Sequence, residues 1–118
     1  MSEAARPPTA TRQRLPNRRA HLVLDFEHGG FAYTAGIGFF DNAGREPAEI
    51  FLTTAKHGTV LDANARDAAI AASLLLQYGC PLDTLRCALT RNRDGSASGP
   101  LAAALDRLHE QRSQAEVV

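Results

Sequence analysis

Hydrophobic and polar positions follow two different periods along this chain, and the change comes at about residue 58. Before it, apolar residues alternate with polar ones, which is typical of strands with one buried face. The alternation predicts three strands, at residues 21–27, 31–40 and 48–54. The segments between them, residues 27–30 and 41–44, contain glycine and polar turn formers. We therefore expect a three-stranded antiparallel β-meander.

After residue 58, apolar residues recur at the spacing of an amphipathic helix. The expected helix covers residues 61–78, with Asp62 as its N-cap. Its predicted buried face consists of Leu61, Ala65, Ala68, Ala69, Ala72, Leu75 and Leu76. A short second helix follows, and a third begins at Pro100 after a polar loop. The predicted fold class is α+β, with two or three α-helices packed on one face of the sheet.

The junction between the first two helices has a strong local signature. Gly79 lies where a left-handed residue would end the long helix, and Pro81 is placed to start the next one. We expect Tyr78 and Leu82 to pack together across this turn, which makes the junction a structural pivot.

Charge is balanced overall but not along the chain. Lysine plus arginine and aspartate plus glutamate number 13 each, yet residues 1–19 carry five arginines and one glutamate. We expect a flexible basic arm at residues 1–19, a folded domain at residues 20–110 and a frayed tail at residues 111–118. No apolar stretch approaches the roughly 20 residues of a membrane-spanning helix, and no secretory signal is apparent, so we expect a cytoplasmic protein without membrane contact.

Two groups of small or basic residues are candidate binding sites. Thr34, Gly36 and Gly38 share one side of the second strand, where the glycines leave a groove of bare backbone. Glycine inside a strand costs stability unless something packs closely against it or the strand bends. Lys56, Gly58 and Thr59 connect the third strand to the long helix, where a helix start could hold an anion.

Arginines and cysteines support two rival hypotheses. The first is a nucleic-acid-binding protein, in which arginines of the arm and of the polar loop contact phosphates. These arginines are Arg12, Arg14, Arg18, Arg19, Arg91 and Arg93. The second is a small thiol-redox or metal-binding protein that works through Cys80, which precedes a helix start. Against it, we expect Cys80 and Cys87 to be buried structural thiols, and the histidine spacing predicts no metal site.

One set of residues resembles a known family. It comprises Glu49-Ile50-Phe51-Leu52, Lys56, Gly58-Thr59 and the junction Leu76-Gln77-Tyr78-Gly79-Cys80-Pro81-Leu82-Asp83. These residues resemble the TSCPD domain, the carboxy-terminal segment of adenosylcobalamin-dependent (class II) ribonucleotide reductases, which also occurs as small free-standing bacterial proteins. The resemblance covers about residues 14–108. The family's naming motif carries a cysteine, whereas the matching loop at residues 96–100 has none.

The resemblance implies a non-catalytic accessory or binding module. The reductase's catalytic barrel and its cobalamin and nucleotide sites need several hundred more residues, so a ribonucleotide reductase label would reflect homology, and we expect no cofactor and no catalytic residue. The expected partner is a second copy in a homodimer or another protein such as a ribonucleotide reductase. Nucleic acid is a weak alternative partner.

Overall fold

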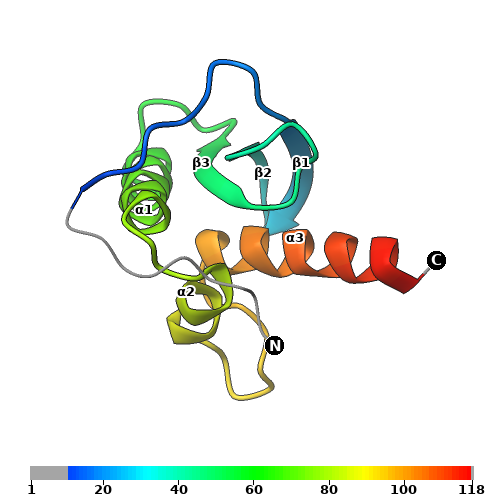
Figure 1. Cartoon of the computed structure of the whole chain (residues 1–118). Coiled ribbons are helices and arrows are strands. Elements are labelled where there is room, and N and C mark those ends of the chain that lie inside the picture. Colours follow the sequence, from blue (N-terminus) through cyan, green and yellow to red (C-terminus); the bar gives the residue numbers. More distant parts are fainter. Residues whose placement is uncertain (1–10, 118) are drawn as a thin grey trace.

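Three strands and three helices follow one another in the computed structural model, which describes residues 11–117 (Figure 1). The strands are β1 (His21–His28), β2 (Phe31–Phe39) and β3 (Pro47–Thr54), and the helices are α1 (Val60–Gln77), α2 (Leu82–Ala88) and α3 (Pro100–Val117). The strands form one antiparallel sheet in the order β1-β2-β3. The predicted α+β meander is confirmed. Residues 1–10 of the predicted basic arm lie outside the described residues.

The sheet has one face toward the helices and one open face. Residues that point toward the helices form the core: Leu24, Phe26, Tyr33, Ala35, Ile37, Phe39, Ile50 and Leu52. On the helix side, α1 contributes alanines and Leu76, and α3 contributes Leu101, Leu105 and Leu108. Alanine at Ala65, Ala69 and Ala72 lets α1 approach the sheet closely. In Figure 1, α1 is seen nearly end-on beside β3, and α3 runs below the strands in this view.

The outer edge of β3 is bonded by polar side chains of α1. Ser73 accepts a hydrogen bond from the Ile50 amide at 2.7 Å and donates to the Ile50 carbonyl at 3.1 Å. Gln77 Nε2 donates to the Ala48 carbonyl at 3.0 Å, and Asp62 accepts from the Thr54 amide. An exposed edge strand would otherwise present these groups to another chain. Helix α1 therefore closes this edge of the sheet.

Helix α1 begins and ends with two different caps. The predicted N-cap Asp62 is wrong: Thr59 is the cap, and its hydroxyl accepts from the Asp62 amide at 3.2 Å. Asp62 lies inside the first turn, and its side chain is directed to β3 instead. At the other end, Gly79 has φ 98°, which confirms the left-handed residue. The Cys80 and Gly79 amides donate to the carbonyls of Leu75 and Leu76, a Schellman ending that leads to Pro81.

Helix α3 is longer than the sequence pattern indicated. It continues to Val117, so residues 111–117, which we expected to fray, are helical. Arg112 donates to the Arg45 carbonyl at 2.9 Å, which attaches this part of the helix to the β2–β3 turn.

Candidate functional site

The open face of the sheet contains three rows of facing residues. The register aligns His21 with Gly38 and Glu49, Val23 with Gly36 and Phe51, and Asp25 with Thr34 and Thr53. A Cβ added to Gly38 would lie 2.3 Å from a Glu49 carboxylate oxygen, and one on Gly36 would lie 3.1 Å from His21 Nε2. The notch above both glycines is thus filled by side chains of β1 and β3. Packing within the sheet accounts for these glycines.

The predicted anion site at the β3–α1 connection contains an exposed lysine and a hydroxyl that is already hydrogen-bonded within the chain. Thr59 is the N-cap of α1, and its hydroxyl also donates to the Lys56 carbonyl. Gly58 has φ 77°, as the tight turn before the helix requires. Lys56 is exposed. The structure does not bring these three residues together with the glycine pair, which lies farther along β2.

A shallow pocket of about 540 Å³ lies where the sheet meets the start of α1. Its lining includes Asp25, Glu27, Tyr33, Thr34, Thr53 and His57. Thr34 donates to Asp25 at 2.8 Å. Thr34 is the predicted site residue that lines this pocket, and His57, not Lys56, is also part of the lining. Burial, and then the nearby Asp62 carboxylate, raise the pKa of Tyr33 above its usual value.

Asp62 is the polar centre beside this pocket. Arg66 Nε donates to it at 2.7 Å, and the Thr54 amide and Thr53 hydroxyl donate at 3.1 and 3.0 Å. The Arg66 hydrogen bond, followed by the Thr54 amide, lowers the pKa of Asp62 to about 2. His57 Nδ1 lies 3.9 Å from the carboxylate. The group is a satisfied carboxylate that joins β3 to α1, and its low pKa makes it unsuited to proton transfer near neutral pH.

Several predicted phosphate-binding arginines contact the protein itself. Residues 11–20, which we call the N-terminal strap, run from the end of α1 to the start of β1 (Figure 1). Arg12 donates to the Gln77 side chain, and the Gln13 amide donates to the Gln77 carbonyl at 2.9 Å. Arg19 pairs with Glu49 at 3.0 Å. Of the strap arginines predicted to contact phosphate, Arg14 and Arg18 are exposed, and neither has such a partner among residues 11–117.

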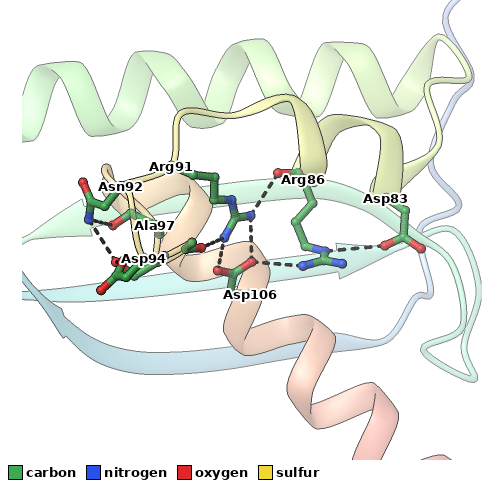
Figure 2. A network of polar contacts seen from close by, with 9 residues as sticks. Asp83, Arg86, Arg91, Asn92, Asp94, Ala97 and Asp106 are labelled. Carbon is green, nitrogen blue, oxygen red and sulfur yellow. Dashed lines mark hydrogen bonds and ion pairs between the residues drawn. The ribbon is translucent and has the colours of Figure 1, made fainter.

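Arg91 belongs to a network of ion pairs between the polar loop and α3. Figure 2 shows Arg91 and Arg86 directed at the same carboxylate, that of Asp106. Arg91 also donates to the Arg86 carbonyl at 3.1 Å. The Arg91 guanidinium is the main cause that holds the pKa of Asp106 below its usual range. Arg91 therefore fixes the loop to the helix, and Arg93 alone of the two predicted loop arginines is exposed.

The cysteines are free in the structure, as expected, but they differ in burial. Cys80 is half-buried, with its thiol 3.5 Å from the Pro81 carbonyl, whereas Cys87 is exposed. The prediction that both thiols are buried is wrong for Cys87, which α2 turns toward solvent. Among residues 11–117, no group of three or more His, Cys, Asp or Glu is placed to hold a metal ion. No helix in that range is long and apolar enough to span a membrane.

One surface that the sequence reading missed is the outward side of α1. Ile70, Leu74, Leu75 and Tyr78 are 58%, 38%, 46% and 40% exposed, and Ala71 lies exposed among them. We call these five residues the α1 stripe. The prediction that Leu75 belongs to the buried face is wrong: in this part of α1 the buried apolar residues are Ala69, Ala72 and Leu76. Two signals were available: Ile70, Leu74 and Tyr78 are spaced by four, and residues 68–82 contain no charge.

Comparison with known proteins relates this chain to part of a reductase. It is 34% identical over 74 residues, 63% of the chain, to the vitamin B12-dependent ribonucleotide reductase of Rhodopirellula baltica. This chain spans 7% of the length of that protein. No family model matches the chain, and no solved structure matches it. Sequence similarity therefore connects the chain to a small region of a B12-dependent ribonucleotide reductase.

Proposed function

We propose that this chain is a non-catalytic, cytoplasmic binding module of the TSCPD type, related to a region of B12-dependent ribonucleotide reductase, and that it acts by self-association through the α1 stripe. The observation that carries the proposal is the stripe itself. Four large apolar side chains are exposed on one helix, within a segment of 15 residues (68–82) that lacks charge. A helix that is apolar on its outward side as well as its core side is typically covered by a partner.

The polar groups of the described residues favour a binding role over catalysis. Asp62 and Asp106 are engaged with arginines that hold their pKa values low. The exposed Thr34 hydroxyl donates to Asp25, an arrangement that joins two neighbouring strands. These pairs stabilise the fold, and none of them leaves a general base positioned beside a nucleophile.

Self-association through the stripe is tested by the mass of the particle in solution. We expect the parent protein to form a dimer with a dissociation constant in the micromolar range, measured by sedimentation equilibrium. The double variant Ile70→Gln and Leu74→Gln should be monomeric at the same concentrations, because glutamine keeps the helix propensity and removes the apolar contact. Val60→Gln is the matched control, since Val60 is 75% exposed on the same helix but outside the stripe.

Three outcomes would contradict the proposal. A parent protein that stays monomeric at several hundred micromolar would overturn self-association. A double variant that dimerises like the parent would move the interface away from α1. Ribonucleotide reduction by the isolated chain with adenosylcobalamin would overturn the non-catalytic role. If the monomeric parent binds a purified B12-dependent reductase and the double variant does not, the stripe binds the reductase instead of a second copy.

A further inference from the structure

We infer that the second copy docks with its α1 antiparallel to the first, so that Asp67 of each copy pairs with Arg14 in the N-terminal strap of the other. This inference rests on the proposed self-association and specifies its geometry. It follows from three features of the described residues: the stripe is centred on Leu74, Asp67 lies at one end of it, and Arg14 lies near the other end.

Leu74 lies at the middle of the α1 stripe. Ile70 precedes it by four residues and Tyr78 follows it by four, so both lie about 6 Å from Leu74 along the helix axis. A two-fold axis at Leu74 would place Ile70 of one copy against Tyr78 of the other. Ala71 lies one position after Ile70 on the exposed side and has a small side chain, which permits the interaxial distance of about 8–10 Å that packed helices adopt.

The two ends of the stripe carry opposite charges. Asp67 is exposed and precedes Ile70 by three residues and Leu74 by seven, so it continues the same side of the helix. At the other end, the strap is attached to the last residue of α1 through Gln13 and Arg12. The next residue, Arg14, is exposed, and no side-chain partner is found for it in the part of the chain that the structure describes.

An antiparallel pair therefore matches unlike charges twice. Asp67 lies about 10 Å from the axis at Leu74, beyond the point where the helix of the second copy ends at Gln77. The strap of the second copy lies at this end of its α1, so Asp67 pairs with Arg14 of that strap across the interface. The two-fold axis repeats the same contact on the other side. A parallel arrangement would bring the Asp67 carboxylates together instead. Charge complementarity thus selects the antiparallel copy.

The size of the surface agrees with a weak dimer. A standard interface covers about 800 Å² on each partner, whereas the stripe offers a few hundred Å² of apolar surface, the size of the largest patch on a typical monomer. The strap must supply part of the remaining contact. Ion pairs at its rim are screened by salt, so dimerisation should weaken as ionic strength rises.

Charge reversal tests the pairing without relying on one variant's stability. Alone, Asp67→Arg and Arg14→Asp should each dimerise about tenfold more weakly than the parent at low salt, because each homodimer would contain two like-charge contacts. An equimolar mixture of the two variants should recover the parent's dimerisation, since the heterodimer restores both opposite-charge contacts. Arg18→Asp, on the strap but nearer to β1, is the control and should leave dimerisation unchanged.

The results separate this inference from the proposed function. If the single variants dimerise like the parent, or if the mixture is as weak as its components, the antiparallel pairing is wrong. The stripe variants would still report on self-association itself. Circular dichroism of each variant before mixing shows whether it is folded, and recovery in the mixture requires that both are.

Discussion

Gln77 provides a direct test of how α1 is held against the sheet. Its side chain is 2% exposed, and its Nε2 donates to the carbonyl of Ala48, a residue with no exposed surface. Its Oε1 accepts from Arg12, so one amide connects α1, β3 and the N-terminal strap. Gln77→Leu retains the approximate volume and removes both hydrogen bonds. It therefore leaves the Ala48 carbonyl buried without its partner.

The expected loss follows from that carbonyl. A buried acceptor left without a hydrogen bond costs about 1–3 kcal/mol. For a domain of this size, each kcal/mol lowers the melting temperature by roughly 4 °C, so Gln77→Leu should melt about 4–12 °C below the parent. The assay is thermal unfolding followed by circular dichroism at a fixed protein concentration. A fixed concentration is needed because dimerisation would itself shift the melting temperature.

The control is the same substitution at an exposed position. Gln111 lies exposed on α3, and Gln111→Leu should change the melting temperature by about 2 °C or less. If Gln77→Leu melts as the parent does, the contact with Ala48 is not what closes the outer edge of β3. The explanation of α1 as an edge-closing helix would then be wrong.

Two further predictions concern the end and the start of α1. Gly79→Val should lower the free energy of unfolding by about 1–2 kcal/mol or more, because a β-branched residue would have to adopt φ 98°. Gly79→Asn should cost less. Equal melting temperatures for the parent and the valine variant would refute the role of this junction as a structural pivot. Asp62 has a folded-state pKa of about 2, below its ordinary 3.8, so its contribution is present above about pH 4 and is lost as the pH falls toward 2. Urea unfolding from pH 6 to pH 2 should therefore show a steeper acid loss for the parent than for Asp62→Asn, and parallel curves would contradict this.

The strands and helices could be predicted because their patterns are local. Alternation fixed which residues of β1–β3 face the helices, and the Gly79–Pro81 signature fixed how α1 ends. The polar residues Ser73 and Gln77 could not be interpreted this way. Their role depends on the lateral position of α1 relative to β3, a tertiary property that has no periodicity in the sequence. The N-cap was misassigned for the same reason. The Asp62 carboxylate accepts a hydrogen bond from the Thr54 amide of β3, and Thr59 is the residue that caps the helix.

The candidate site was harder to predict than the fold. Gly36 and Gly38 were interpreted as bare backbone in a candidate binding site, and the sequence could not show that side chains of His21 and Glu49 in adjacent strands occupy this space. The arginines were counted as free charges, whereas the positions of Gln77, Glu49 and Asp106 decide which of them remain available. Ion pairs between distant segments determine the surface charge that a partner meets, and this can be read only from the folded chain.

The packing of helix α1 explains why its own exposed apolar residues lie where they do. Its alanine face must approach the sheet closely, and its polar face must supply hydrogen bonds to the edge of β3. These two requirements occupy adjacent sides of the helix, so its rotation about its own axis is fixed. The remaining side then has to point outward, and after Asp67 it contains Ile70, Ala71, Leu74, Leu75 and Tyr78 with no charge. A helix that needed only a core face could carry charges on that side at no cost to the fold. The absence of charge there is therefore not required by the fold of one chain, and the proposed burial against a second copy would supply a physical reason for it.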